Sequence, residues 1–457
     1  MSSFPATLFA GEVFSIVGLG RNGLPVALAL RAMGADVTAW DDSEPARRTA
    51  AAQGIAIANP EDSGKTPRAI ILSPGIPHLR PRIHPAAAWA RAHDVPILSD
   101  ADILFQAVRR AGSRARFAGI TGTNGKSTTT ALLAHILAAS GVPTAAGGNL
   151  GTPSLALPLL PDHGVYVLEM SSYMLERLSS LRFDAAAMLN LSPDHIDRHG
   201  DMAGYAAAKR QVFARQRAND TAVIGIDDPL SQAMAAGLPA PVTVSGFQPA
   251  DIWGAGRILR DRLGPILDLA TCPTLPGAHN AQNAAAAVAL AGALGLSRGD
   301  ITRHMPSYPG LPHRQQLVAT HHGIAFVNDS KATNADAAAR ALGCYEKLVW
   351  IAGGQAKEGG IAPLAEFFPR IAHAMLIGQD APALAATLAA HGVPHTMTET
   401  LDAALPAAYE VARATGTPTV LLSPACASFD QFSGFDARGD RFAALARELA
   451  HARDGVP

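Results

Sequence analysis

The stretch Gly119-Ile120-Thr121-Gly122-Thr123-Asn124-Gly125-Lys126-Ser127-Thr128 decides how this chain folds around its ligand. It follows an apolar run and precedes an amphipathic one, so it predicts a strand, a glycine-rich turn and the start of a helix. In such a turn the backbone N–H groups and the helix N-terminus face phosphate oxygens, Lys126 reaches the outer phosphates, and the Ser127 hydroxyl can ligate Mg²⁺. The stretch therefore predicts a nucleotide triphosphate site.

The glycine spacing of this turn departs from the strict P-loop pattern. Ile120 stands where the first glycine belongs, and the additional glycines are Gly119 and Gly122. A tight turn that merely caps a helix is the alternative interpretation. Such a turn would have no need of the Lys126-Ser127 pair at its end, so we favour the nucleotide site.

Length and charge limit the classes of protein to which the chain can belong. Its 457 residues are too many for one hydrophobic core and indicate two or three domains. With 48% hydrophobic and 16% charged residues the composition is that of compact globular domains. Lys plus Arg (37) nearly balance Asp plus Glu (38), and this net charge of −1 gives no electrostatic case for nucleic acid or anionic membranes.

Cysteine content and apolar runs bear on the compartment. Cys272, Cys344 and Cys426 are scattered without metal-ligand spacing, which fits small core residues in a reducing compartment. A signal peptide requires basic residues near its N-terminus, and no basic residue precedes Arg21. The longest apolar run, 284–296, is shorter than the ~18 residues that span a bilayer and predicts a buried helix. We expect a soluble, cytoplasmic protein.

The same alternation of β-branched runs and Ala/Leu-rich stretches occurs three times, which predicts an α/β fold of parallel sheets flanked by helices. Proline-punctuated stretches near residues 96–114 and 307–312 separate the three units. We therefore predict domains at 1–100, 101–310 and 311–457. The expected strands are 13–17, 36–40, 69–72, 117–120, 165–168, 187–190, 324–327, 348–351, 375–377 and 420–422.

A second glycine loop, Gly18-Leu19-Gly20-Arg21-Asn22-Gly23, lies between an expected strand and helix. Asp41 and Asp42 end the next strand, where a dinucleotide-binding domain carries its ribose-binding acid. Taken alone the pattern indicates NAD and a redox protein. A dehydrogenase has no use for the triphosphate loop, so we favour another nucleotide diphosphate. The segment Ser73-Pro74-Gly75-Ile76 also lies at the end of a strand. It is either a ligand-binding segment or an ordinary turn.

Polar residues at other strand ends are candidates for holding metal. Glu169 follows an apolar strand, as a second-strand acid does in P-loop domains. His195 follows the next strand and is either a metal ligand or a polar loop residue. Lys209 lies in a helical stretch and by itself would be taken for part of a solvated helix face.

Further candidates lie toward the C-terminus. Asn280 and Asn283 open the alanine-rich helix, where asparagine also serves as a cap. Arg314 and Lys331 flank the start of the third unit and are either a phosphate clamp or surface cations. The loop 423–432 is rich in small hydroxyl residues and fits either a ligand carboxylate or an irregular connection.

Together these motifs resemble those of the Mur ligases, the ATP-dependent amide ligases that build the peptidoglycan stem peptide. The resemblance covers essentially the whole chain in order. The phosphate loop is shared with sister ligases, whereas the last two motifs are particular to members that add D-glutamate. The motifs are GLG-x-x-G at 18–23, SPGI at 73–76, TGTNGKST at 121–128, GGN at 147–149, LEMSS at 168–172, DHIDR at 194–198, Lys209, GLPHR at 310–314, NDSKATN at 328–334 and SPACASFDQF at 423–432.

The resemblance implies an N-terminal Rossmann-like UDP-binding sheet, a central P-loop ATPase-like sheet and a C-terminal Rossmann-like sheet that binds the amino acid. ATP-contacting positions are then Gly122, Thr123, Asn124, Gly125, Lys126, Ser127, Thr128, Asn280, Asn283, Arg314, Asp329 and Lys331. The UDP-substrate positions are Gly18, Gly20, Arg21, Asn22, Asp41, Asp42, Ser73, Pro74, Gly75, Asn149 and Ser171. The D-glutamate positions are Thr333, Lys357, Ser428, Phe429 and Phe435.

The resemblance also implies the chemistry. Lys126, His195 and Lys209 are the expected catalytic residues. Magnesium, with two ions expected, is held by Ser127, Glu169, His195 and Lys209, the last as a carbamate. The implied substrates are UDP-MurNAc-L-Ala and D-glutamate, joined through an acyl phosphate, and we expect a monomer.

Two alternatives stay open: a sister ligase that adds L-glutamate or another amino acid, and the redox protein named above. Several residues differ from those that are frequent in the family, and they bear on uridine and substrate contacts: Asp42, Ser43, Met174, Gln315, Gln316, Gln355 and Ala356.

Overall fold

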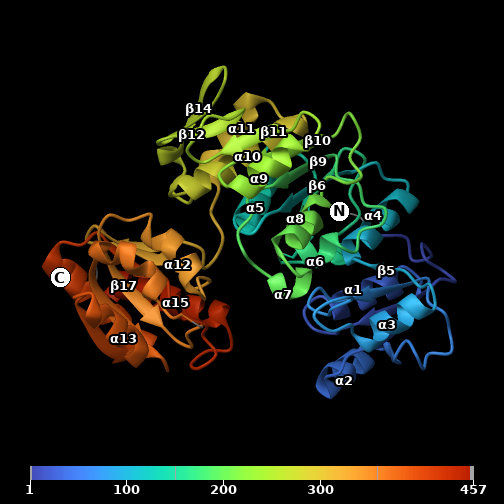
Figure 1. The fold of residues 1–457 in the computed structure, drawn as a ribbon, viewed down its shortest axis with the longest axis horizontal. Coiled ribbons are helices and arrows are strands. Elements are labelled where there is room, and N and C mark those ends of the chain that lie inside the picture. The colour runs from blue at the N-terminus through green and yellow to red at the C-terminus, as the bar shows by residue number, and fades with distance from the viewer. Residues whose placement is uncertain (1–2, 150, 358, 453–457) are drawn as a thin grey trace. The chain divides into compact units, whose positions relative to one another are not determined.

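A computed structural model describes residues 3–149, 151–357 and 359–452, and it has three mixed or parallel β-sheets with helices packed around them (Figure 1). The chain forms two compact units. The first comprises Met1–Pro273 and Ala278–Tyr308, and the second comprises Thr274–Gly277 and Pro309–Pro457. Two of the sheets belong to the first unit and the third sheet belongs to the second.

The first sheet has the order β3-β2-β1-β4-β5 and is parallel throughout. The chain runs outward from β1 on one side and places β4 on the other, so the order reverses between β1 and β4. Such a reversal opens a crevice at the carboxyl ends of the strands. The strands are β1 (Val13–Val17), β2 (Asp36–Trp40), β3 (Ala56–Ile57), β4 (Ala69–Leu72) and β5 (Ile97–Leu98), and the helices are α1 (Gly23–Ala32), α2 (Glu44–Ala52), α3 (Pro85–Ala92) and α4 (Asp100–Arg110).

The central sheet has the order β14-β13-β12-β11-β10-β9-β6-β8-β7. Strands β6 to β12 pair in parallel, whereas β12, β13 and β14 form an antiparallel ribbon. Every residue of β8 is buried, as expected of a strand covered on both faces. The strands are β6 (Arg116–Thr121), β7 (Thr144–Gly148), β8 (Val165–Glu169), β9 (Ala185–Met188), β10 (Thr221–Gly225), β11 (Val242–Ser245), β12 (Ile252–Ala255), β13 (Ile258–Asp261) and β14 (Gly264–Asp268).

Short and long helices cover this sheet, and the alanine-rich helix α10 is buried along most of its length. They are α5 (Lys126–Ala139), α6 (Ser172–Leu175), α7 (Ile196–His199), α8 (Met202–Arg210), α9 (Pro229–Ala236), α10 (Ala278–Ala293) and α11 (Arg298–His304), with the short 3₁₀ turns η1 (Ser154–Ala156), η2 (Leu269–Thr271) and η3 (Met305–Ser307). Across the described ranges of the chain, no helix combines the length and apolarity that crossing a membrane demands.

The sheet of the second unit has the order β15-β16-β20-β17-β18-β19. It is parallel except for β15, which pairs antiparallel with β16. Its strands are β15 (Gln316–His321), β16 (Ile324–Asn328), β17 (Leu348–Gly353), β18 (Ile371–Ile377), β19 (His395–Glu399) and β20 (Thr419–Leu422), and its helices are α12 (Ala335–Leu342), η4 (Ala362–Arg370), α13 (Ala381–Ala390), α14 (Leu401–Thr415) and α15 (Phe435–Ala452).

The sequence predictions of the α/β class and of nine of the ten strands are confirmed. The strand expected at 187–190 instead spans Ala185–Met188, because alanines continue the buried run backward while Asn190 turns away into a loop. The antiparallel ribbon β12–β14 and strand β15 were not expected, since their short, half-polar runs carry little hydrophobic periodicity. The domain boundaries near 100 and 310 stay predictions.

Candidate active site

The turn between β6 and α5 has the backbone geometry that its glycines permit. Gly122 and Gly125 have φ values of 145° and 83°, which L-residues with side chains rarely adopt. A Cβ atom on Gly125 would lie 2.1 Å from the Asn283 Oδ1 atom, so α10 packs directly against the turn. Asn283 also accepts a hydrogen bond from Thr129 Oγ1 at 3.3 Å. Asn283 therefore supports the predicted phosphate loop from beneath.

Polar contacts from the neighbouring strand fix the rest of this turn. The Asn124 backbone N–H donates to Asn190 Oδ1 at 2.9 Å, and the Ser192 N–H donates to Thr123 Oγ1 at 3.0 Å. The Thr123 hydroxyl also lies 3.3 Å from the Tyr205 hydroxyl. Sequence reasoning did not identify Asn190 or Tyr205, whose contacts join segments more than sixty residues apart.

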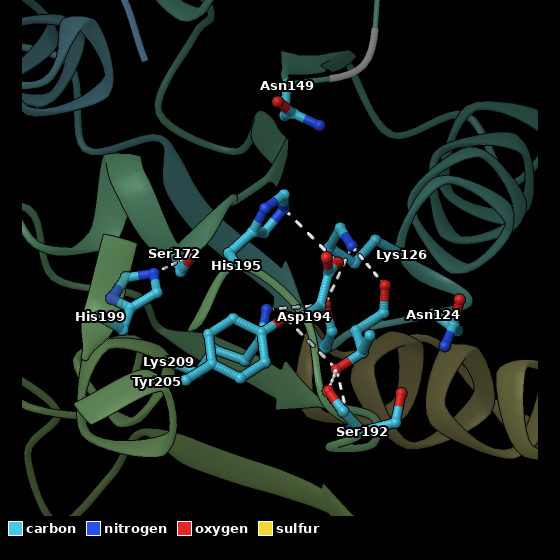
Figure 2. A network of polar contacts seen from close by, with 12 residues as sticks. Asn124, Lys126, Asn149, Ser172, Ser192, Asp194, His195, His199, Tyr205 and Lys209 are labelled. Atoms are coloured by element: carbon cyan, nitrogen blue, oxygen red, sulfur yellow. Dashed lines mark hydrogen bonds and ion pairs between the residues drawn. The ribbon is translucent and has the colours of Figure 1, made fainter. Parts of the chain in front are cut away.

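Two lysines from different helices converge on this turn (Figure 2). Lys126 Nζ donates to the carbonyls of Gly122 (2.9 Å) and Thr123 (2.8 Å), and Lys209 Nζ donates to the same Gly122 carbonyl at 2.8 Å. Lys209 is 1% exposed, so the interpretation as a solvated helix face is wrong. Burial, with a further contribution from the positive charge of Lys126, holds the pKa of Lys209 well below its usual range.

Glu169 is the last residue of β8, and Asn149 follows the adjacent strand β7. Glu169 is 2% exposed, and its Oε1 atom accepts from Asn149 Nδ2 at 2.7 Å. Its Oε2 atom is buried and has no hydrogen-bond partner among the described residues. A buried carboxylate oxygen without a donor is poorly stabilised unless a cation is beside it.

His195 lies at the start of α7 with a φ of 53°, and its Nε2 atom is 3.4 Å from Asp194 Oδ2. Burial lowers the pKa of His195, so its imidazole is neutral and able to ligate metal at pH 7. Ser127 is buried in the first turn of α5. No group of three or more carboxylate, imidazole or thiol side chains able to hold an ion occurs in the described part of the chain. Any magnesium ion here needs further oxygen ligands.

A cavity of about 490 Å³ opens at the carboxyl ends of β1, β2 and β4, where the strand order reverses. Sequence reasoning had selected most of its lining. The lining residues are Val17, Gly18, Gly20, Arg21, Asn22, Asp41, Asp42, Ser73, Gly75, Ile76, His84 and Asn149. Ile76 belongs to the segment 73–76 that the sequence had suggested, whereas Val17 and His84 were missed. The His84-Pro85 pair, a cap followed by a helix-starting proline, could have drawn attention to that position.

The glycine loop of this cavity is held by side chains on both sides. Ser73 Oγ donates to the Gly18 carbonyl at 2.8 Å, and a Cβ on Gly18 would meet Ser73 and Ile76 within 2.8 Å. The Leu19 backbone N–H donates to Asp41 Oδ2 at 2.6 Å. Asp41 thus positions the loop as well as lining the cavity. Asn149 belongs to the cavity wall and also binds Glu169, so one side chain joins this cavity to the end of β8 in the central sheet.

In the second unit, loops from the adjacent strands β16, β20 and β17 carry Thr333, Ser428 and Lys357. Ser428 is buried, and its Oγ atom has no hydrogen-bond partner in the residues described. Arg438 of α15 ties the loops together by donating to the carbonyls of Ser330 (2.9 Å) and Cys426 (3.1 Å). Arg438 therefore joins the loops that follow β16 and β20.

Other predicted residues of the second unit lie in and around these loops. Burial raises the pKa of Asp329 to about 7, although it accepts from Ser423 Oγ at 2.8 Å and lies near Arg314. Lys331 Nζ is 5.1 Å from the centre of the Phe435 ring. Phe429 is 70% exposed.

Two predicted positions of the first unit make structural contacts. Ser171 caps α6 by accepting from the Met174 N–H at 3.3 Å. Asn280 Oδ1 accepts from Asn283 Nδ2 at 3.0 Å inside α10.

Comparison with known proteins identifies the family. A model described as the Mur ligase middle domain matches residues 120–291, and one described as the Mur ligase, glutamate ligase domain matches residues 313–426. The UDP-N-acetylmuramoylalanine--D-glutamate ligase of Paramagnetospirillum magneticum is 49% identical over 459 residues, covering 98% of each chain. This chain belongs to the Mur ligase family. The enzyme of the same description from Rhodospirillum rubrum is 47% identical and covers 98% of this chain and 97% of its own.

Solved structures agree on the Mur ligase fold. The UDP-N-acetylmuramate-alanine ligase of Thermotoga maritima matches with a TM-score of 0.60 at 18% identity, over 95% of this chain and 99% of its own. MurF from Acinetobacter baumannii gives a TM-score of 0.60 at 19% identity, over 96% and 91%. At such identities the likeness concerns the fold alone, and it accords with the three sheets of this Mur ligase.

Proposed function

We propose that this Mur ligase uses ATP to join D-glutamate to UDP-N-acetylmuramoyl-L-alanine in the synthesis of peptidoglycan precursors. The observation that carries the proposal is the near-full-length similarity to enzymes described as D-glutamate ligases, at 47–49% identity. The geometry of the first unit supports it. Asn149 lines a cavity fit for a nucleotide diphosphate and binds Glu169, and the charge of Glu169 acts on Lys209, which contacts the phosphate loop.

The first chemical step activates a carboxylate, which by itself is a poor electrophile. One carboxylate oxygen of the L-alanyl group attacks the γ-phosphorus of ATP, the bond to the β-phosphate oxygen breaks, and ADP leaves. The product is an acyl phosphate. Lys126 is placed at the phosphate loop to neutralise charge on the transferred group once its Nζ atom leaves the loop carbonyls that it contacts here.

The second step forms the amide. The neutral amine of D-glutamate attacks the acyl carbon, inorganic phosphate leaves with the electrons of the C–O bond, and the nitrogen gives up a proton to solvent or phosphate. No side chain acts as a covalent nucleophile, so positioning and electrostatics provide the rate acceleration. The amino acid is assigned to the strand ends of the second unit, with Thr333, Lys357, Ser428, Phe429 and Phe435 as its contacts. The buried, unpartnered Ser428 hydroxyl supports that assignment.

The residues around the phosphate loop fit magnesium. The buried, unpartnered Oε2 atom of Glu169 offers a hard oxygen ligand, and Ser127, His195 and a carbamate on Lys209 would complete the protein's share. Water and substrate phosphates usually supply most of the remaining ligands of Mg²⁺. This accounts for the absence of a cluster of three or more metal-binding side chains among the described residues. When bound, it screens the negative charge of the phosphates. We propose two ions.

We also propose that Lys209 carries a carbamate. CO₂ adds to the neutral form of an amine: the Nζ lone pair forms the N–C bond, one proton is lost, and a carboxylate results. The lowered pKa of Lys209 makes that neutral form accessible. The modification turns a cation into an oxygen ligand next to Glu169 and thereby removes the repulsion between Lys209, Lys126 and a metal ion.

We propose that the enzyme acts in the cytoplasm as a monomer. The remaining ATP contacts are assigned to the loop 122–128, to Asn280 and Asn283, and to Arg314, Asp329 and Lys331 of the second unit. The diphosphate of the UDP substrate is assigned to the N-terminus of α1 in the first cavity.

Phosphate release with ATP, Mg²⁺ and UDP-MurNAc-L-Ala tests the function against a panel of D-glutamate, L-glutamate, L-lysine and meso-diaminopimelate. We expect release with D-glutamate. Release with another member of the panel alone would make the chain a sister ligase. NADH titration covers the redox alternative, which alone predicts binding of that cofactor.

A further inference from the structure

Arg177, next to the end of α6, is buried and binds the loop that follows β4. Its Nη1 atom donates to the carbonyls of Leu72 (2.9 Å) and Ser73 (3.3 Å), and its Nη2 atom donates to that of Ile76. Ser73 and Ile76 line the first cavity. Because one rigid guanidinium donates to three carbonyls, the position of α6 and the shape of the cavity wall are fixed together.

Glu176, the preceding residue, binds the opposite side. Its Oε1 atom accepts from His199 Nδ1 at 2.9 Å, and its Oε2 atom lies 3.6 Å from Arg198 Nη2. His199 and Arg198 belong to α7, whose N-cap is the candidate metal ligand His195. The other ring nitrogen of His199 lies 3.0 Å from Ser172 Oγ (Figure 2). Helix α7 is therefore bound to both ends of α6.

His78 closes the network from the cavity side. Its Nδ1 atom accepts from Arg198 Nη2 at 3.0 Å and from Arg177 Nε at 3.4 Å. Burial, followed by the charge of Arg177, lowers the pKa of His78 to about 4, so it stays neutral and acts as an acceptor at pH 7. Although burial alone would raise the pKa of Glu176, the hydrogen bond from His199 and nearby positive charge lower it overall. Glu176 is therefore the anion that balances two arginines.

We propose that the Glu176–Arg177 pair is a positioning element that couples the sugar-nucleotide cavity to the magnesium–nucleotide site. Arg177 binds the loop that forms the cavity wall, and Glu176 binds α7, whose N-cap is His195. The two residues are adjacent in the chain, so a shift of one loop is passed to the other. A ligand that orders one loop lowers the cost of ordering the other, and this makes the two binding free energies interdependent. The inference rests on the proposed function for the identity of the two ligands.

Calorimetry on the full-length protein measures this coupling. The dissociation constant of UDP-MurNAc-L-Ala is determined alone and with saturating Mg²⁺ and a non-hydrolysable ATP analogue with a methylene bridge between the β- and γ-phosphates. We expect the analogue to tighten binding about tenfold in the wild type, within the usual range of coupling between sites. In Glu176→Gln the ratio of the two constants should fall below about twofold, because the neutral amide no longer holds His199 and Arg198 as a pair. If Glu176 had a purely structural role, the substitution would raise both dissociation constants by the same factor and leave their ratio unchanged.

Glu12→Gln is the matched control. Glu12 is also a carboxylate with two arginine partners, Arg68 and Arg110, and its side chain is 23% exposed against 18% for Glu176. It precedes β1, at the end of the sheet opposite the cavity. We expect the wild-type ratio in this variant.

His199→Phe provides a second route to the same test if Glu176→Gln does not fold, since it removes the other partner of the bond and keeps a ring in place. A wild-type ratio in either folded variant would overturn the proposal, as would two ligands that bind the wild type without coupling. Failure of the wild type to bind either ligand would instead overturn the proposed function.

Discussion

The two glycine loops of the first unit share one backbone design and differ in their charged surroundings. Each follows a parallel strand and opens a helix, and each has a glycine with positive φ against which another segment packs: Ser73 against Gly18 and Asn283 against Gly125. The 122–128 loop holds two lysines on the Gly122 carbonyl. The 18–23 loop instead has acids beside it, and Asp41 accepts from the Leu19 N–H.

The difference teaches that glycine spacing encodes only a close approach of backbone to ligand, whereas neighbouring charges select which phosphate group is bound. A triphosphate that transfers its terminal group requires cations. A diphosphate that only anchors a substrate can rely on backbone N–H groups and a helix N-terminus, while acids are free to accept from hydroxyl groups. The predictions below test this division of roles, beginning with the largest effect.

Lys126→Ala should lower the rate of phosphate release by at least 10²–10³, because one charge contact with the transferred group is lost. Binding of UDP-MurNAc-L-Ala, measured by calorimetry, should stay within about twofold of the wild type if the loops have separate roles. Lys347→Ala is the control, since Lys347 is an exposed lysine that also donates to a carbonyl, that of Thr415. Turnover near the wild-type rate in Lys126→Ala would contradict the assignment.

Lys209→Ala should lose about 10² or more in rate and recover part of it with added acetate or another small carboxylic acid, which replaces the carbamate oxygens. Removing bicarbonate should also slow the wild type. The same acids should leave Lys126→Ala inactive, because that variant lacks a cation rather than an anion. Equal rescue of both variants, or indifference to bicarbonate, would count against the carbamate.

Gly125→Ala should raise the KM for ATP about tenfold or more, because its Cβ would meet Asn283 Oδ1 at 2.1 Å and push the turn out of position. Gly141→Ala separates this clash from backbone strain. Gly141 has a similar φ of 81° but nothing within 4 Å of an added Cβ, so it should cost about 1 kcal/mol of stability and leave KM alone. Steady-state kinetics measure the KM for ATP, and thermal melts measure the stability of each variant. Equal KM values in the two variants would refute the steric argument.

Gly18→Ala should have the smallest effect and the opposite selectivity, with a several-fold rise in the KM for UDP-MurNAc-L-Ala and little change in that for ATP. Its Cβ would lie 2.7 Å from Ile76 Cδ1 and 2.8 Å from Ser73 Cβ, which is a smaller overlap than the 2.1 Å approach of the Gly125 Cβ to Asn283 Oδ1. Gly11→Ala, at φ 80° in open space, serves as the control. A larger effect on ATP than on the UDP substrate would break the contrast between the loops.

Much of this site could be read from local sequence. Gly119 to Thr128 predicts its strand, turn and helix because turn geometry depends on a few consecutive residues, and Glu169 was found because an acid at the end of an apolar strand is conspicuous. The ribbon β12–β14 was missed because short, half-exposed strands lack a periodic apolar signal. His84 and Tyr205 were missed because their importance depends on contacts with distant segments.

The sequence by itself determined the α/β class, the two glycine loops and the family, since each is encoded in contiguous residues. Only the tertiary structure decided that Lys209 is buried against the phosphate loop. In the sequence it is one polar residue in an alanine-rich helix, yet packing buries it and brings its Nζ atom to a carbonyl 87 residues away. Burial and the charge of Lys126 then lower its pKa, and no local pattern can report either effect because both arise where separate segments meet.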